Sequence, residues 1–283
     1  MTALTFVGIG AIGLPMAARL QSAGYSVTGI DPMATARDRA AAVGITATAS
    51  IIDAARADVV IVMVATPDQL ATLLDQAGDT VRDQTWVIMS TVGPDAIKVQ
   101  AERLVSAGAR VVDAPVTGGA TRAATGELVI FTSGLASEVE DVSSILSMLG
   151  TVRVVGGRIG DGQSVKIVNQ HLCSIHIVAA AEALSLADSL GLDRASVLEL
   201  VAGGAAGSWM LSDRGPRMLG DTDVAVMSTI NIFVKDSGLV ASAADRVGAE
   251  VPLLRAAEER YRRAADGGLG ARDDSRVVET YAR

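Results

Sequence analysis

The chain has 283 residues, of which 49% are hydrophobic and only 3% aromatic, and its formal net charge is -8. This length suits two domains better than one, and the apolar content excludes disorder by composition. Because acidic residues outnumber basic ones and no run of Lys or Arg occurs, we expect no nucleic-acid partner.

The first half of the chain predicts a parallel sheet covered by helices. Short β-branched runs alternate with alanine-rich stretches, and the unbroken apolar run Val59–Val64 is typical of a strand buried on both faces. The expected strands are Ala3–Val7, Ser26–Ile30, Val59–Val64, Trp86–Met89, Arg110–Asp113, Leu128–Thr132 and Val152–Val155. The expected helices include Leu14–Ala23, Ala34–Val43, Asp68–Ala77 and Ala96–Ala107.

The pattern changes near residue 160, beyond which strand signals almost disappear. Gln163–Leu190 predicts one long helix, with Gly191 placed to stop it, and further helices are expected over Arg194–Val201, Thr222–Val247 and Leu253–Asp266. The sequence therefore predicts an α/β protein of two domains. A Rossmann-like, doubly wound, mostly parallel sheet occupies residues 1–160, and an all-α domain with a long interdomain helix occupies residues 161–283.

A glycine-rich turn follows the first expected strand and precedes the first expected helix. Gly8-Ile9-Gly10-Ala11-Ile12-Gly13 has the spacing of a dinucleotide-binding loop. In such a loop the first glycine allows the turn, the second leaves room for the pyrophosphate, and the third lets helix and strand pack closely. The strand–turn–helix context favours cofactor binding by all six residues over a plain turn.

The end of the second expected strand bears on the choice of cofactor. Asp31 lies 18 residues after Gly13, where a carboxylate accepts hydrogen bonds from the ribose hydroxyls and repels a 2′-phosphate. We therefore expect NAD in preference to NADP. Arg37 and Arg39 remain able to shield a phosphate, and Asp31 before Pro32 can also be read as a turn residue.

The remaining signals predict a cytoplasmic protein without a membrane span or a metal site. Cys173 is the only cysteine, which fits a reducing compartment, and the N-terminus has no signal-peptide pattern. The most apolar long stretch, Leu172–Leu190, contains a histidine and two carboxylates, as a buried helix does. His171 and His176 are five residues apart and do not share the face of a helical metal pair.

With these features in view, the chain resembles the β-hydroxyacid dehydrogenase family, which includes 3-hydroxyisobutyrate dehydrogenases. The likeness covers nearly the whole chain and is closest to the L-threonate dehydrogenase and tartronate semialdehyde reductase branch. Four family motifs carry it, in order: the loop and helix Gly8–Leu20, the substrate motif Asp113-Ala114-Pro115-Val116-Thr117-Gly118-Gly119, the catalytic stretch Gly160–Gln170, and the pair Lys235-Asp236. The chain departs from the family at Thr117, usually serine, at Val64-Ala65-Thr66-Pro67, and at Gln170.

The resemblance assigns the proton chemistry to Lys166, which lies between the apolar residues Val165 and Ile167 on the expected long helix. As general acid/base it would take the hydroxyl proton during oxidation and return it during reduction. The Thr117 hydroxyl and the backbone N–H groups of Gly118 and Gly119 would bind the substrate carboxylate, because glycine permits close approach. The alternative for these three residues is a structural turn after Pro115.

The resemblance also implies roles for residues around this centre. Asn169 and Gln170, one turn beyond Lys166, would bind a substrate hydroxyl or orient the lysine, and Thr91 and Val64 would lie beside the nicotinamide. Lys235 would close over the cofactor or the substrate, and its alternative is a surface cation. The implied partner is a small 3-hydroxy acid or its carbonyl product, and the implied assembly is a homodimer or homotetramer.

Two other functions share this architecture. An imine reductase generally lacks the catalytic lysine, and so does a non-catalytic NAD-binding module. Lys166 therefore favours an NAD(P)-dependent dehydrogenase of small 3-hydroxy acids, of the threonate, glycerate/tartronate semialdehyde or 3-hydroxyisobutyrate type, over both alternatives.

Overall fold

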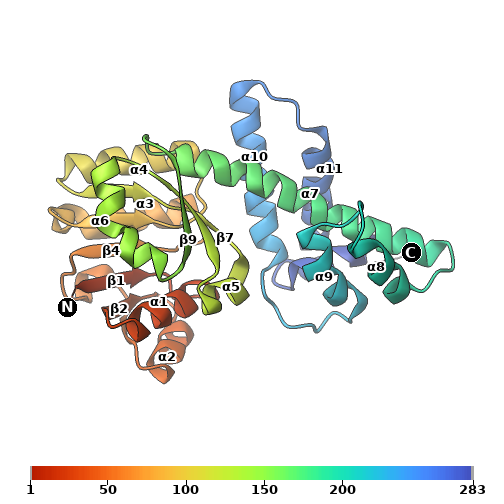
Figure 1. Ribbon diagram of the computed structural model, residues 1–283, viewed down its shortest axis with the longest axis horizontal. Helices are drawn as coiled ribbons and strands as arrows, with labels where there is room; N and C mark the ends of the chain where they lie inside the picture. Colours follow the sequence, from red (N-terminus) through yellow and green to blue (C-terminus); the bar gives the residue numbers. More distant parts are fainter. Residues whose placement is uncertain (1, 282–283) are drawn as a thin grey trace. The chain divides into compact units, whose positions relative to one another are not determined.

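A computed structural model describes residues 2–281 of the chain (Figure 1). These residues form two compact units, which are divided between Lys166 and Ile167. The first unit is α/β and the second is helical, so the predicted fold class is confirmed.

The first unit contains a nine-stranded sheet among the described residues. Its strands run in the order β3-β2-β1-β4-β5-β6-β8-β7, and β9 pairs with β8. All pairs from β3 to β6 are parallel, whereas β8 is antiparallel to both β6 and β7. The strands are β1 (Ala3–Val7), β2 (Ser26–Ile30), β3 (Thr46–Thr48), β4 (Val59–Val62), β5 (Thr85–Ile88), β6 (Arg110–Asp113), β7 (Val116–Thr117), β8 (Leu128–Ser133) and β9 (Gly150–Gly156).

Helices cover both faces of this sheet, as the continuous apolar strands predicted. Met16, Leu20 and Val142 belong to the core on one face, and Leu70 and Ile97 belong to the core on the other. The helices are α1 (Gly13–Ser22), α2 (Ala34–Ala42), α3 (Pro67–Ala77), α4 (Pro94–Ser106), α5 (Gly119–Thr125) and α6 (Ala136–Ser147). Helices α1, α2, α5 and α6 share the first face, and α3 and α4 share the second.

The strand order places a switch point between β1 and β4. From β1 the chain winds outward through β2 to β3, and then returns to add β4 on the other side of β1. Ligands of open α/β sheets bind outside the carboxyl ends of the strands at such a point. The glycine loop, which follows β1 directly, therefore lies at the edge of the sheet where a dinucleotide is expected.

The second unit is built from helices that pack around Phe233 and Tyr261, whose rings stack with centroids 5.2 Å apart. Helix α10 packs alongside α11, as Figure 1 shows. Helix α7 (Asp161–Ser189) starts in the first unit and continues into the second, and it ends before Gly191, which has a positive φ of 74°. The other helices are α8 (Arg194–Ala202), α9 (Trp209–Leu219), α10 (Ile230–Val247) and α11 (Pro252–Ala264), followed by a π turn (Ala265–Leu269) and the 3-10 segment η4 (Asp274–Tyr281).

Two helix predictions in the second unit need correction. The helix expected over Thr222–Val247 begins only at Ile230, because the Thr229 side chain accepts a hydrogen bond from the Ile232 N–H and caps the helix there. Helix α9 was not expected at all, although Ser208 caps it by accepting from the Leu211 N–H. Its internal proline, Pro216, hides the helical pattern.

Among the described helices, α7 is the one long and apolar enough to cross a membrane by length and composition, and 39% of its most apolar window is buried. Core helices of soluble proteins share these properties, so the observation is weak evidence for a span.

Candidate active site

The glycine loop between β1 and α1 has the shape that a dinucleotide needs. Gly8 has a φ of 86°, and a Cβ there would collide with the Met63 carbonyl oxygen, while a Cβ on Gly13 would collide with the Gly8 carbonyl oxygen. No heavy atom lies within 4 Å of the position that a Cβ on Gly10 would take. Gly8 and Gly13 therefore close the turn, and Gly10 leaves room for a phosphate beside the first N–H groups of α1.

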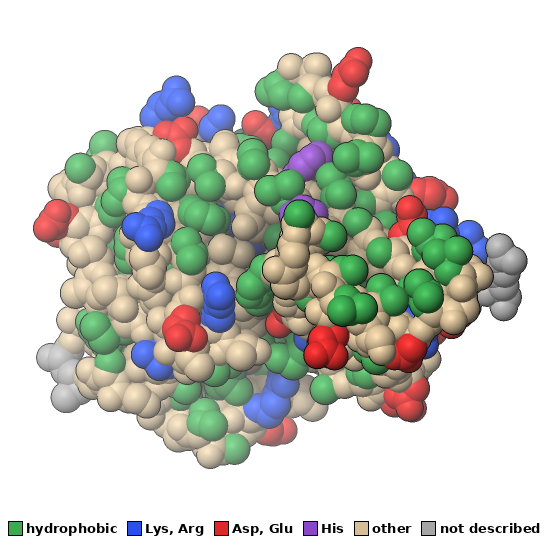
Figure 2. All heavy atoms as spheres, turned by 45° about the vertical axis from the view of Figure 1, so that its right-hand side comes forward, with side chains coloured by type: hydrophobic (Ala, Val, Ile, Leu, Met, Phe, Trp, Pro, Cys, Tyr) green, Lys and Arg blue, Asp and Glu red, His purple; other side chains and the backbone are tan. Residues whose placement is uncertain are grey.

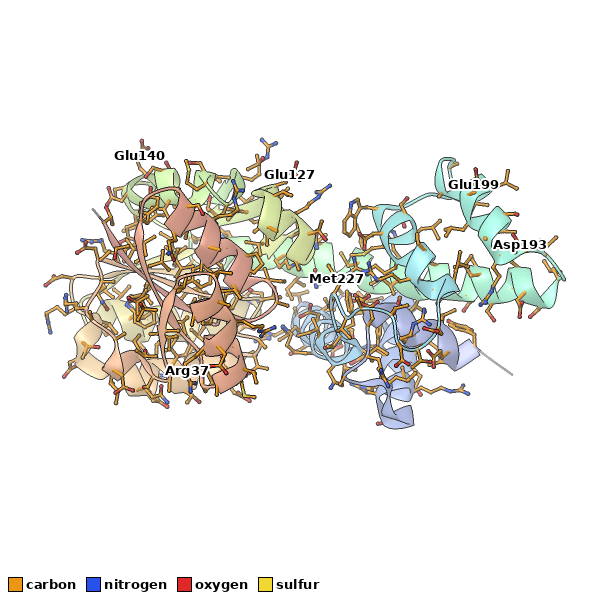
Figure 3. The ribbon with its side chains drawn as sticks, turned by 90° about the horizontal axis from the view of Figure 1, so that it is seen from below. Arg37, Glu127, Glu140, Asp193, Glu199 and Met227 are labelled. Carbon is orange, nitrogen blue, oxygen red and sulfur yellow. The ribbon has the colours of Figure 1, made fainter. Side chains whose placement is uncertain are left out.

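Asp31 follows β2, and one of its oxygens is already used. Asp31 Oδ1 accepts a hydrogen bond of 2.9 Å from the Met33 N–H, so the turn that the sequence offered as an alternative is present. Arg37, labelled in Figure 3, donates from Nη1 to the carbonyl oxygens of Asp31 and Pro32, both at 2.8 Å. The other carboxylate oxygen, Oδ2, does not take part in this turn. It can therefore accept a hydrogen bond from a ribose hydroxyl.

Hydrogen bonds of the Ser90 hydroxyl fix the backbone of the segment after β5, which includes Thr91. The Ser90 hydroxyl accepts from the Val64 N–H at 2.8 Å and donates to the Val62 carbonyl at 3.3 Å. Ser90 therefore joins two expected nicotinamide neighbours, Val64 and Thr91, across the carboxyl ends of β4 and β5. Both Val64 and Thr91 are partly exposed, as a cofactor contact requires.

The substrate motif forms the short strand β7 and the turn into α5. Thr117 pairs with Val129 of β8, and the next two residues have positive φ values, 135° at Gly118 and 71° at Gly119. A Cβ on Gly118 would press against Arg122, but nothing lies within 4 Å of the Cβ position at Gly119. The motif therefore is a structural turn, and Gly119 also offers the open backbone that a carboxylate needs.

Lys166 lies in the second turn of α7, and its exposed fraction is 6%. The start of this helix is pressed against the sheet. A Cβ on Gly162 would come within 2.6 Å of the Phe131 carbonyl oxygen and within 2.9 Å of Asp113 Oδ2, and Gly160 has a φ of 100°. The glycines before Lys166 thus serve close packing of the helix on the strand ends.

Asp113, at the end of β6, is the carboxylate that receives this helix. Asp113 Oδ2 accepts from the N–H groups of Gly160 and Gln163 at 3.0 Å each, and from the Ser133 hydroxyl at 3.1 Å. Burial raises the pKa of Asp113 above 3.8, and the hydrogen bonds from Gln163, Ser133 and Gly160 oppose that rise. The sequence reading placed Asp113 in a motif but gave it no role; a charged residue ending a buried strand was the signal.

A second polar chain lies in the helical unit. Gln170 Nε2 donates to Asp236 Oδ2 at 2.5 Å, and Lys235 Nζ lies 2.8 Å from Asp236 Oδ1. Asn169 Nδ2 donates to Gln170 Oε1 at 2.9 Å. The structure thus brings together Asn169, Gln170 and Lys235. It adds a contact for Asp236, which the sequence placed in a motif without giving it a role, although a carboxylate on the apolar face of α10 is a signal.

This chain of contacts limits what Gln170 can still do. An amide has two N–H donors and two acceptor lone pairs, and Asp236 and Asn169 occupy one of each. These two hydrogen bonds fix the orientation of the Gln170 amide. In residues 2–281, no group of three or more His, Cys, Asp or Glu side chains is arranged to hold a metal ion.

Family models match both halves of the chain. Residues 3–159 match the model described as the NAD binding domain of 6-phosphogluconate dehydrogenase. Residues 160–281 match the model described as NAD-binding of NADP-dependent 3-hydroxyisobutyrate dehydrogenase.

Curated relatives match over nearly the full length. An L-threonate dehydrogenase of Cupriavidus necator is 35% identical, with 97% of this chain and 94% of the relative covered. A 2-hydroxy-3-oxopropionate reductase of Escherichia coli is 32% identical, with 98% and 96% covered. Among solved structures, a 3-hydroxyisobutyrate dehydrogenase from Salmonella typhimurium is 30% identical, covers 99% of this chain and all of its own, and superposes with a TM-score of 0.92.

Imine reductases share the fold at a greater distance. The enzyme from Streptomyces aurantiacus is 22% identical, with 99% of this chain and 100% of that chain covered, and has a TM-score of 0.68. At this identity the likeness shows the fold alone.

Proposed function

Because the chain belongs to the 3-hydroxyisobutyrate dehydrogenase family of NAD(P)-dependent β-hydroxyacid dehydrogenases, we propose that it transfers a hydride between nicotinamide and a small 3-hydroxy acid. The acids proposed are of the threonate, glycerate/tartronate semialdehyde or 3-hydroxyisobutyrate type. The single observation that carries the proposal is Lys166, the motif lysine, held with 6% of its surface exposed on a helix anchored to the sheet.

The residues of the first unit fit a dinucleotide. The open space at Gly10 accepts a pyrophosphate that a Cβ would exclude, and the N-terminus of α1 has no acidic residue in its first turn to oppose it. Asp31 supports the adenosine ribose, and Val64 and Thr91 line the nicotinamide end. When bound, the nicotinamide supplies the hydride acceptor or donor.

The chain itself supplies binding and proton transfer. The backbone at Gly118 and Gly119, with the Thr117 hydroxyl, binds the substrate carboxylate. Lys166 Nζ takes the proton from the substrate hydroxyl as the carbon gives up its hydride, and in the reverse direction it protonates the new alkoxide. Gln170, at the carboxamide position that the family motif implies, binds a further substrate hydroxyl, and Asn169 and Lys235 hold its amide and its carboxylate partner Asp236 in place.

The test is turnover by the unaltered protein on a panel of small acids. Threonate, glycerate, 3-hydroxyisobutyrate and 3-hydroxypropionate are each offered with NAD and with NADP, and nicotinamide reduction is followed by absorbance. We expect at least one acid to be oxidised. Binding of NADH without turnover on any of them would instead identify a non-catalytic NAD-binding module.

We further propose that NAD is preferred to NADP. The free oxygen of Asp31 would repel a 2′-phosphate, and Arg37 is engaged by two backbone carbonyls. Asp31→Asn keeps the oxygen that accepts from Met33 but removes the charge, so we expect the NAD/NADP ratio of kcat/KM to fall at least ~10-fold, or about 1.4 kcal/mol. An unchanged ratio would remove Asp31 from the cofactor site.

We also propose that the chain forms a homodimer or homotetramer through α7. Large apolar residues spaced by three, four or seven positions lie exposed along one side of this helix, and Figure 2 shows hydrophobic side chains gathered on one face of the second unit. The residues are Val165, Val168, Leu172, Leu186 and Leu190, with exposed fractions from 36% to 65%. Light scattering should give a multiple of 28.9 kDa, and Leu186→Lys should reduce it. A monomer in the unaltered protein would refute the proposal.

A cytoplasmic location of the protein stays a prediction.

A further inference from the structure

Gln163 is a glutamine whose side chain is completely buried in the first unit, with an exposed fraction of 0%. Its Oε1 accepts from the N–H groups of Val92 and Gly93, both at 3.0 Å. Its Nε2 donates to the Ser90 carbonyl oxygen at 2.9 Å and to Asp113 Oδ1 at 3.0 Å. These four bonds use both donors and both lone pairs of the amide.

The partners of the Gln163 amide belong to two segments, the one expected beside the nicotinamide and the one expected to bind the substrate carboxylate. Ser90, Val92 and Gly93 are the residues on either side of Thr91, the expected nicotinamide neighbour. Asp113 begins the motif that continues to Thr117, Gly118 and Gly119. Gln163 itself lies one helical turn before Lys166 on α7, and residues three apart share a helix face.

Only a full amide satisfies all of these partners. A glutamate would have no N–H to donate to Ser90 or Asp113, and it would place a second carboxylate against the first in a buried site. A methionine fills the volume but leaves two N–H groups, a carbonyl and a carboxylate oxygen without this partner. An asparagine keeps the chemistry but is shorter by one methylene, so it reaches only some of the four groups.

We propose that Gln163 is a positioning residue that sets the place of Lys166 relative to the nicotinamide segment at Thr91 and the carboxylate-binding turn at Thr117. The proposal rests on the proposed function. In this role Gln163 touches neither substrate nor cofactor and acts through its bonds to Ser90, Val92, Gly93 and Asp113. Misplacement of a reacting group by about 1 Å can cost on the order of 100-fold in rate.

The Gln163 side chain contacts the segment that follows β5. The test compares Gln163→Met with a matched variant of Gln84, which precedes the same strand. Gln84 is also a buried glutamine, 7% exposed, whose Nε2 donates to the Ala57 carbonyl at 2.8 Å and whose Oε1 accepts from the Trp86 indole at 3.3 Å. It lies at the amino end of the strand, away from Ser90. Gln84→Met therefore reports the cost of losing a buried amide without touching the proposed positioning.

For folded protein, verified by thermal unfolding, we expect Gln163→Met to lower kcat at least ~10-fold, while NADH affinity measured by fluorescence changes less than ~3-fold. The solvent deuterium isotope effect on kcat should rise, because proton transfer at Lys166 becomes slower. Gln84→Met should leave kcat and the isotope effect unchanged. Gln163→Asn, which retains the amide and suits a protein that does not tolerate methionine here, should recover part of the lost kcat.

Each outcome separates the two claims. If the unaltered protein turns over an acid but Gln163→Met and Gln84→Met have equal kcat and equal isotope effects, the positioning role is wrong and the proposed function stands. A parallel loss of kcat and of NADH affinity would likewise overturn it, since a general structural role explains both. Absence of turnover by the unaltered protein would refute the proposed function, and the positioning role with it.

Discussion

The two units bury polar groups in different ways. In the first unit, Asp113 is surrounded by neutral donors: two backbone N–H groups, the Ser133 hydroxyl and the Gln163 amide. In the second unit, Asp274 and Asp273 are fully buried against the guanidinium groups of Arg214 and Arg217. The first arrangement fixes the helix that carries Lys166, and the second fixes a loop.

This loop joins α9 to α10, the helix that carries Lys235 and Asp236. Asp273 Oδ2 accepts from the N–H of Met227, labelled in Figure 3, at 2.9 Å. Arg276 donates from Nη1 to the carbonyl oxygens of Gly220 and Asp221 at 2.8 and 2.9 Å. Charged side chains thus provide hydrogen-bond partners for the backbone of a loop that belongs to no sheet or helix. At the strand ends of the first unit, one carboxylate and neutral hydrogen-bond donors are enough to hold the start of α7.

The largest expected effect comes from breaking the buried ion pair. Asp274→Ala removes the carboxylate that accepts from Arg214 Nη2 at 2.8 Å. It leaves the guanidinium buried with Asp213 alone, so we expect a loss of about 3–5 kcal/mol in the free energy of unfolding. Denaturation by urea measures it.

The matched control for that change is an exposed ion pair. Arg272 Nη1 lies 2.9 Å from Asp223, and their side chains are 47% and 83% exposed. Arg272→Ala should cost about 0–1 kcal/mol, because water replaces the contact. Similar losses for Arg272→Ala and Asp274→Ala would contradict the view that the buried pair holds the loop.

A smaller, pH-dependent effect is expected at Asp113. Because its folded pKa is raised above 3.8, the native state holds this proton more tightly than the unfolded chain. The free energy of unfolding therefore falls as the pH rises from 3.8 to the raised value. Ser133→Ala removes a hydrogen bond that lowers the pKa of Asp113, so this pKa rises further. The pH range over which stability falls then extends to higher pH.

We therefore expect Ser133→Ala to cost about 1 kcal/mol near neutral pH and less near pH 4. Denaturation curves at several pH values give the difference from the unaltered protein. Ser237→Ala is the control, because the Ser237 hydroxyl is buried but donates to the Phe233 carbonyl, which does not titrate there. A Ser133→Ala loss that is independent of pH would separate Ser133 from the ionisation of Asp113.

Sequence reasoning found the parts of the fold that follow from periodicity and glycine spacing. The strands of the parallel sheet, the long helix α7 and its stop at Gly191 all depend on local patterns. The start of α10 was missed because the apolar residues Val224 and Val226 continue the helical pattern, whereas the chain there is held by Asp273 and Arg276, about fifty residues further along. Such distant charged partners leave no local signal.

The candidate site shows the same division. Lys166 and the glycine loop could be named from motifs, and Thr117 from a resemblance. Gln163 and Asp236 lie within motifs, but their roles could not be assigned, because these roles depend on partners 50 to 73 residues away for Gln163 and 66 for Asp236. A polar residue on a face that is otherwise apolar marks such positions, but not what they bind.

The most direct test of the account is kinetic and concerns Lys166. Lys166→Met keeps a long side chain at the same buried position but removes the amine. With an acid that the unaltered protein oxidises, we expect kcat to fall by about 100- to 10,000-fold, while the Kd for NADH changes less than ~3-fold. Retention of kcat, or equal losses of kcat and NADH affinity, would contradict the assignment of Lys166 as the general acid/base.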